Sequence, residues 1–383
     1  MLVSDYNYDL PEERIAKFPP KERGTTRLLV LNRKTGEIQD SFYRNLDEFL
    51  NPGDVLILND TRVMQSRLFC ELPDGRQREL VVLEKHGDES QKVMYRGKLH
   101  DGDVLLLDKG SFEDNKSSID SEGIRSSSML NKGSFEEHNR RRGDYGATEP
   151  RDDGREEAFR ERVFIKHILG NGIAEVESQT PLTELAEKYG SVPLPPYLHR
   201  DATEDDKKRY QTVWAKNMGS AAAPTASLNM TEDLLERLKN KGIKICYLTL
   251  HVGLGTFLPM RTDKVEEHKM HSEWFNIPEE TITAIKTAKS ENHRVVAVGT
   301  TVTRTLEYYG KTGKTSGEDD IFIYPGFEFT IIDALLTNYH APKSTVLMLA
   351  SAFAGWEHLK AAYGHAVDAE YNFLSYGDSM LIC

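Results

Sequence analysis

Residues 245–257 read Ile-Cys-Tyr-Leu-Thr-Leu-His-Val-Gly-Leu-Gly-Thr-Phe. The apolar run rich in β-forming residues ends in His251 and is followed by two glycines, Gly253 and Gly255. An apolar strand, a polar tip and a glycine-rich turn are how α/β proteins present reactive groups at the edge of a sheet. This stretch therefore predicts an α/β fold with its chemistry at one sheet edge.

Three histidines and a glutamate crowd this region of the sequence. A pKa near neutrality suits histidine for proton transfer, and His251 is the first choice because it ends the strand. A histidine bonded within a loop is the structural alternative. His268 and His271 stand between glutamates, and in an extended segment His271 and Glu273 share a face. A zinc site is a further interpretation of these pairs, although no close third ligand is evident.

Strands and helices alternate through the rest of the second half of the chain. Residues 231–239 predict an amphipathic helix capped by Thr231, and residues 278–286 predict another. Residues 27–31 and 55–58 read as buried strands. The alternation predicts a large mixed α/β domain.

A second, smaller domain is predicted inside the first. Residues 63–178 contain short β segments at regular spacing, which favour a small antiparallel barrel or sandwich. The large domain then comprises residues 1–62 and 179–383. Within the small domain, residues 109–160 have almost no aliphatic periodicity, so we expect that insert to be disordered.

Residues 294–301 read as a strand that ends in a Gly-Thr-Thr turn. A helix is predicted to follow from Thr303. Thr300, Thr301 and Arg304 at this helix start predict a cradle for a carboxylate or a phosphate. A helix cap with a surface salt bridge is the structural alternative. Asp60 and Arg62, at the end of another strand, form either an orienting pair in the site or a plain ion pair.

Composition limits the class of protein. The 383 residues carry a net charge of −12, which argues against a general nucleic-acid coat but leaves room for a local basic patch. No apolar run approaches the ~20 residues that cross a bilayer, and no signal peptide is seen. The three cysteines are far apart, which fits a reducing cytoplasm.

Collinear motifs over nearly the whole chain, apart from residues 109–160, resemble a known family. The chain is similar to the S-adenosylmethionine:tRNA ribosyltransferase-isomerases of queuosine biosynthesis. The segments that carry the resemblance include Leu58-Asn-Asp-Thr-Arg-Val63, Pro193-Leu-Pro-Pro-Tyr197, Ala222-Ala-Pro-Thr-Ala226, Thr249-Leu-His-Val-Gly-Leu-Gly-Thr-Phe257, Glu267-His-Lys-Met-His-Ser-Glu273, Val298-Gly-Thr-Thr301, Thr337-Asn-Tyr-His340 and Ser375-Tyr-Gly-Asp378.

The resemblance implies a reaction and its partners. The ribosyl part of S-adenosylmethionine passes to 7-aminomethyl-7-deazaguanine in a tRNA with a GUN-type anticodon and is rearranged to an epoxycyclopentanediol, while adenine and methionine leave. S-adenosylmethionine is then a substrate, no cofactor or metal is expected, and the protein is expected to be a cytoplasmic monomer. The predicted substrate-binding residues are Asn59, Asp60, Arg62, Thr225, Asn229, Gly253, Gly255, Thr300, Thr301, Arg304, Tyr324, Asn338 and His340.

One motif departs from the family pattern. Where the family has glycine, histidine and phenylalanine, this chain has Ser227, Asn229 and Met230. Asparagine cannot carry a proton at neutral pH. The alternative hypothesis is therefore a weakened or repurposed homologue that binds tRNA or S-adenosylmethionine without turnover.

Overall fold

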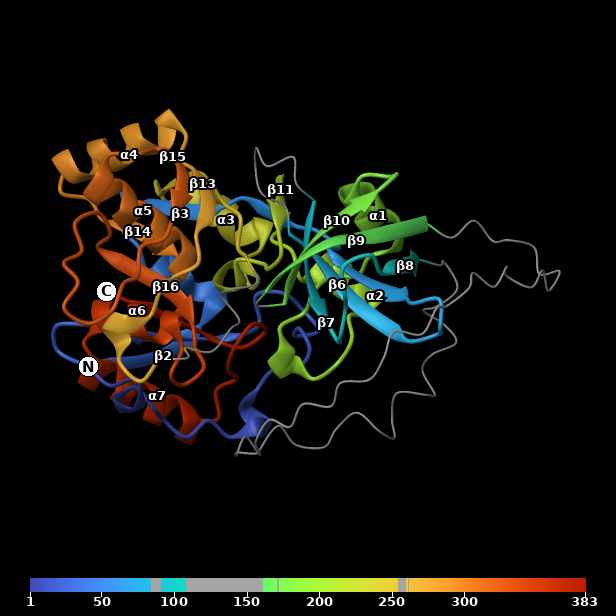
Figure 1. Ribbon diagram of the computed structural model, residues 1–383. Coiled ribbons are helices and arrows are strands. Elements are labelled where there is room, and N and C mark those ends of the chain that lie inside the picture. The colour runs from blue at the N-terminus through green and yellow to red at the C-terminus, as the bar shows by residue number, and fades with distance from the viewer. Residues whose placement is uncertain (84–90, 108–160, 171, 254–259, 261) are drawn as a thin grey trace, which may run out of the picture.

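The computed structural model describes residues 1–83, 91–107, 161–170, 172–253, 260 and 262–383. A large mixed α/β domain carries a small closed antiparallel β-barrel (Figure 1), so the predicted fold class is confirmed. Among the helices that these residues form, none is both long and apolar enough to span a bilayer.

Nine strands form the central sheet of the large domain: β1 (Arg27–Leu31), β2 (Ile38–Phe42), β3 (Val55–Asn59), β12 (Lys244–Leu250), β13 (Glu273–Asn276), β14 (Val295–Val298), β15 (Ser316–Asp319), β16 (Ala334–Asn338) and β17 (Ser379–Ile382). Their order across the sheet is β15-β13-β12-β3-β14-β16-β17-β1-β2. Strands β12, β3, β14 and β16 run parallel, so their carboxyl ends share one edge. Ligands of open α/β sheets bind at such an edge.

Alternate side chains of β3 enter two different cores, one on each face of the sheet. Val55 and Ile57 pack among helices α4 to α7, whereas Leu56 and Leu58 pack against α3 and the 3-10 helix η3. Because both faces are covered, the parallel strands read as continuous apolar runs. The covering elements are η3 (Tyr43–Phe49), α3 (Glu232–Asn240), α4 (Glu279–Ser290), α5 (Thr300–Thr312), α6 (Thr345–Ala354) and α7 (Trp356–Asp368).

The barrel closes in the order β10-β7-β6-β5-β8-β9. Its core also takes Leu182, Leu185 and Ala186 from helix α1, which follows the residue range predicted for the small domain. The barrel elements are β5 (Arg67–Glu71), β6 (Gln77–Leu83), β7 (Lys92–Arg96), β8 (Val104–Leu107), β9 (Glu161–Gly170), β10 (Ile173–Ser178) and α1 (Leu182–Tyr189).

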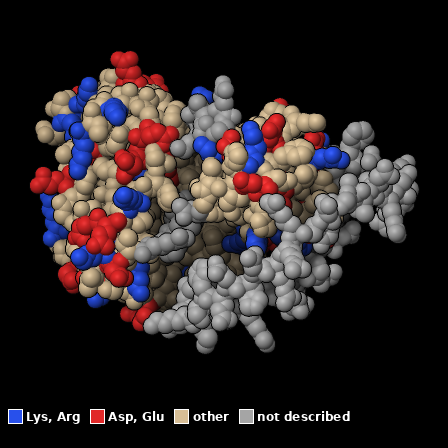
Figure 2. All heavy atoms as spheres, in the orientation of Figure 1, with Lys and Arg blue, Asp and Glu red and all other residues tan. Residues whose placement is uncertain are grey.

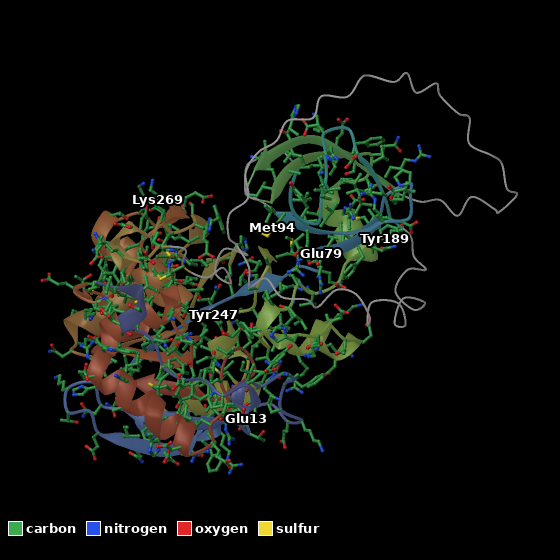
Figure 3. The ribbon with its side chains drawn as sticks, turned by 60° about the horizontal axis from the view of Figure 1, so that its bottom comes forward. Glu13, Glu79, Met94, Tyr189, Tyr247 and Lys269 are labelled. Carbon is green, nitrogen blue, oxygen red and sulfur yellow. The ribbon has the colours of Figure 1, made fainter. Side chains whose placement is uncertain are left out.

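Two short backbone pairings lie where the chain enters and leaves the barrel. Strand β4 (Thr61–Val63) pairs in parallel with β11 (Asn217–Ser220), and Arg67 forms an isolated antiparallel bridge with Ser191. A Cβ at Gly190 would lie 1.8 Å from the carbonyl oxygen of Gln65, so this junction requires glycine. In Figure 3, Tyr247 of β12 lies on the side of the large domain toward the barrel.

The start of helix α5 differs from the prediction. Helix α5 begins at Thr300, three residues early, because Gly299 adopts φ +96° and turns the chain directly out of β14. Helix α6 begins at Thr345 after an N-cap at Ser344, whose hydroxyl accepts from the amide of Leu347. The insert predicted over residues 109–160 lies outside the described residues.

Candidate active site

A cavity of about 380 Å³ opens at the carboxyl edge of β14 and β16. Its wall also includes the first residues of α5, the loop before α6, and residues 222–226. Five residues predicted from the sequence line it: Thr225, Thr300, Thr301, Asn338 and His340. A cavity of this size is typical of small-molecule sites.

The N-terminus of α5 lies at this cavity without a side-chain cap. Its N-cap residue is Gly299, which has no side chain to accept from the first amides of the helix. The hydroxyl of Thr301 is buried and has no partner among the described residues. By contrast, α6 begins at the same cavity with Ser344 as its cap.

Asn338 lies beside this helix start on the neighbouring strand. Val298 of β14 pairs with Leu336 of β16, so the residues two positions further along, Thr300 and Asn338, reach the same edge. Asn338 is buried, and its Nδ2 lies 3.4 Å from the carbonyl oxygen of Asp378, whereas its Oδ1 has no partner among the described residues.

His340 is held in the cavity wall at three points. Its Nε2 lies 2.9 Å from the hydroxyl of Thr337, its backbone amide donates to Tyr363 Oη, and its carbonyl accepts from the Tyr8 hydroxyl. Burial lowers the pKa of His340 to about 3. The imidazole is therefore neutral at physiological pH, so it suits hydrogen bonding to a ligand better than proton transfer.

His251, the predicted proton-transfer group, is buried at the end of β12. Its Nδ1 lies 2.8 Å from Thr61 Oγ1, and its ring stacks on Trp274 with centroids 5.1 Å apart. A Cβ at Gly219 would come within 2.7 Å of the ring. Val252, the next residue, lines the cavity, whereas His251 is not among the described lining residues.

Glu273 and Arg304 form a buried ion pair. Arg304 Nη1 lies 2.7 Å from Glu273 Oε2, while Glu273 Oε1 accepts from the amide of Gly253 at 2.8 Å. Asp319 lies on the other side of Arg304, with its Oδ1 at 3.9 Å, and burial raises the pKa of Asp319 to about 6. Arg304 Nε is buried and has no partner among the described residues.

The other histidines predicted for catalysis are not among the described residues that line this cavity. His268 packs edge-on against Phe322, and its pKa is lowered by burial and by His271. His271 is exposed just before β13, whereas Glu273 is buried. Tyr324 also packs on Phe322, outside the cavity wall. Within the described part of the chain, no group of histidine, cysteine and acidic side chains could hold a metal ion.

Polar residues at the end of β3 make structural bonds. The Asn59 amide donates to the carbonyl of Leu250 and accepts from the amides of Leu250 and Thr61, so it joins β3 to β12. Asp60 accepts from Thr249 and Asn217. Arg62 is exposed, and no ion pair between Arg62 and Asp60 forms among the described residues.

The three departures from the family motif lie behind the cavity wall. Met230 is fully buried in the core that contains α3. Asn229 donates to the carbonyl of Gly377 at 3.1 Å, and Ser227 is buried with its hydroxyl unpartnered among the described residues. None of the three is a described lining residue. Gly255, another predicted site residue, lies outside the described residues.

Sequence reasoning gave no role to several residues of the wall. Tyr197, named only as part of a family motif, lines the cavity and shares a hydrogen bond with Ser375. Thr337, also in the wall, and Tyr8, which is not a described lining residue, both bond to His340. The signal that could have found them was their place in the collinear motifs.

Figure 2 shows a hollow between the large domain and the barrel, with basic and acidic side chains mingled over this face of the large domain. Charge in this view therefore does not by itself indicate a partner.

Comparison with known proteins decides the family. The model of a family described as "Queuosine biosynthesis protein" matches residues 3–382. The chain belongs to this family. A relative from Chlorobium phaeobacteroides is 49% identical, one from Pelodictyon phaeoclathratiforme 46% and one from Sulfurihydrogenibium sp. 42%, each over 100% of both chains. All three are named S-adenosylmethionine:tRNA ribosyltransferase-isomerase.

A solved structure of a family member supports the fold. The S-adenosylmethionine tRNA ribosyltransferase of Thermotoga maritima matches with a TM-score of 0.51 and 28% identity, covering 99% of this chain and 100% of its own. The family resemblance drawn from the motifs is thereby confirmed.

Proposed function

We propose that this protein transfers the ribosyl part of S-adenosylmethionine to 7-aminomethyl-7-deazaguanine in a tRNA anticodon and isomerises it, giving epoxyqueuosine-tRNA. The observation that carries the proposal is a small-molecule cavity at the carboxyl edge of the parallel strands, in a chain that aligns end to end with enzymes named for this activity. The cavity is large enough for an adenosine-sized ligand.

The reaction requires a base near the ribose 5′ carbon, whose protons the neighbouring sulfonium acidifies. His251 is our candidate for this base, oriented by Thr61 and by stacking on Trp274. His340 is unsuited to the role because its pKa is about 3, and we assign it a hydrogen bond to the nucleoside. Glu273, His268 and His271 are the second candidates, since Glu273 holds the amide of Gly253.

The proposal extends to partners and place. We infer a tRNA with a GUN-type anticodon as acceptor, a monomeric enzyme and a cytoplasmic location. The rival hypothesis, binding without turnover, is not favoured because the three substituted motif residues are not among the described residues that line the cavity. Asn229 still makes a hydrogen bond that positions the loop at Gly377.

Adenine release tests the function directly. The wild type should release adenine from S-adenosylmethionine only with tRNA that carries the aminomethyl-deazaguanine, and His251→Ala should lower the rate about 100-fold or more. The matched control is His167→Ala, an exposed histidine of the barrel strand β9, which should keep the wild-type rate.

Two outcomes separate the hypotheses. Wild-type protein that binds the tRNA and S-adenosylmethionine without releasing adenine would support the rival. Full turnover in His251→Ala would remove His251 as the base while leaving the reaction in place. A large gain in Asn229→His would show that the altered motif limits the rate.

A further inference from the structure

Two buried donors beside the start of α5 have no partner among the described residues: the hydroxyl of Thr301 and Nε of Arg304. Arg304 is only 6% exposed. Both residues line a small pocket of about 20 Å³, which shares Thr300, Thr301 and Val346 with the main cavity. Buried polar groups are rarely left unpaired, so these donors indicate a ligand group with acceptor atoms.

The N-terminus of α5 also attracts negative charge. The amides of the first turn of α5 receive no side-chain cap, because the N-cap residue is Gly299. Uncapped amides and the helix dipole together bind anions. Helix α6, which begins in the same cavity wall, has a side-chain cap at Ser344. The missing cap of α5 is therefore not a general feature of this wall.

An unpaired acceptor lies next to these donors. Asn338 Oδ1 is buried without a partner among the described residues, and Asn338 lines the main cavity. The pairing of Val298 with Leu336 brings Asn338 to the same sheet edge as Thr300. Donors in the first turns of α5 and an acceptor at the end of β16 match a ligand that carries an anion and an ammonium close together.

We propose that this edge binds the amino-acid end of S-adenosylmethionine. The carboxylate accepts from the first amides of α5, from the Thr301 hydroxyl and from Arg304 Nε, and the ammonium donates to Asn338 Oδ1. The inference rests on the proposed function and deepens it by placing one part of the substrate.

The size of the small pocket favours a carboxylate over a phosphate of the tRNA backbone. About 20 Å³ holds roughly one water molecule, which matches a carboxylate oxygen. A phosphodiester carries a sugar on each side and does not fit there. Arg304 is already paired with Glu273, so the hydroxyl and the amides supply most of the selectivity.

Two ligands that differ only in the carboxylate test the proposal. Binding of S-adenosylhomocysteine and of its decarboxylated analogue is measured by equilibrium dialysis on the full chain, with the acceptor tRNA present and absent. We expect the wild type to prefer the carboxylate form, and Thr301→Val to reduce that preference about tenfold without changing the affinity for the decarboxylated analogue. Thr301→Ser, which keeps the hydroxyl, should retain the preference.

The matched control is Thr305→Val on the same helix. Thr305 is fully buried, but its hydroxyl donates to the carbonyl of Thr301, so its loss should not change the preference. An unchanged preference in Thr301→Val, or an equal loss in Thr301→Val and Thr301→Ser, would overturn the placement alone. Failure of the wild type to bind either ligand would count against the proposed function as well. Weaker tRNA binding in Thr301→Val with an unchanged preference would indicate a phosphate instead.

Discussion

Asp319 at the end of β15 is fully buried beside Arg304. One carboxylate oxygen accepts from the amide of Ile321, while the other has no partner among the described residues. Burial raises the pKa of Asp319 to about 6, and Arg304 opposes that shift. Between pH 4 and pH 6 the folded protein therefore holds a proton that the unfolded chain releases.

This proton makes stability depend on pH. Because the folded pKa is raised, the charge on Asp319 costs stability above about pH 6, and the cost is relieved as pH falls toward the unfolded value near 3.8. In Asp319→Asn that cost is absent. Relative to the variant, the wild type should lose on the order of 2 kcal/mol of unfolding free energy as pH rises from 4 to 7.

Urea unfolding of both proteins at intervals from pH 4 to pH 8 measures the difference. The control is Asp368→Asn, at the exposed end of α7, which should show no such trend. A wild-type-minus-variant difference that stays constant with pH would contradict the buried-proton account.

The contacts of single side chains were the hardest features to predict from the sequence. The pattern of glycine and threonines located Thr300 and Thr301 at the cavity, because a strand that ends in Gly-Thr-Thr leads into a helix N-terminus. The prediction that Arg304 binds an anion did not include the pairing of its Nη1 with Glu273, because the sequence could not show which buried charges lie together. The hydrogen bond from the Tyr8 hydroxyl to the carbonyl of His340 joins residues far apart in the chain. No local sequence pattern therefore reveals it.

At the scale of elements, α1 belongs to the barrel by packing. Its moderately apolar face places Leu185 in the barrel core, where the side chain is fully buried. The cavity residues come from the large domain, so a defect in α1 should weaken the barrel without changing the substrate site.

Leu185→Ala should therefore lower the stability of the barrel by about 2–5 kcal/mol. Hydrogen exchange should rise in the strands β5 to β10, while the dissociation constant of S-adenosylhomocysteine stays at the wild-type value. Leu169→Ala on β9 is the matched control, since Leu169 is 51% exposed. Equal exchange increases across the central sheet would show that α1 supports the whole molecule instead.

Elements were largely predictable because their signals are local. Apolar runs predicted the central strands. The N-cap at Thr231 predicted the start of α3, and its hydroxyl accepts a hydrogen bond from the amide of Leu234. The predicted start of the helix that follows Gly299 was less accurate. The positive φ of Gly299 allows a sharper turn into α5 than the sequence indicates.

At the scale of the whole molecule, the insert enters and leaves the barrel at adjacent points. Leu107 at the end of β8 pairs directly with Glu161 at the start of β9. Antiparallel neighbours of this kind can be joined by a short turn.

Replacing residues 108–160 by a short Asn-Gly turn should thus preserve the barrel, its melting temperature within a few degrees, and adenine release. Circular dichroism and the adenine assay measure these outcomes. Loss of adenine release with an intact fold would show that the insert acts in the reaction. The division into residues 1–62 with 179–383 and residues 63–178 stays a prediction.

The place of β17 has a consequence for synthesis on the ribosome. Strand β1 is made early, yet its parallel neighbour in the sheet is β17, which is translated after all the other described strands. The hairpin of β1 and β2 must wait, with one row of backbone groups unmatched, until β17 has been made. Such an open strand edge invites association with other nascent chains, so we expect the yield of native protein to depend on chaperones that shield the growing polypeptide.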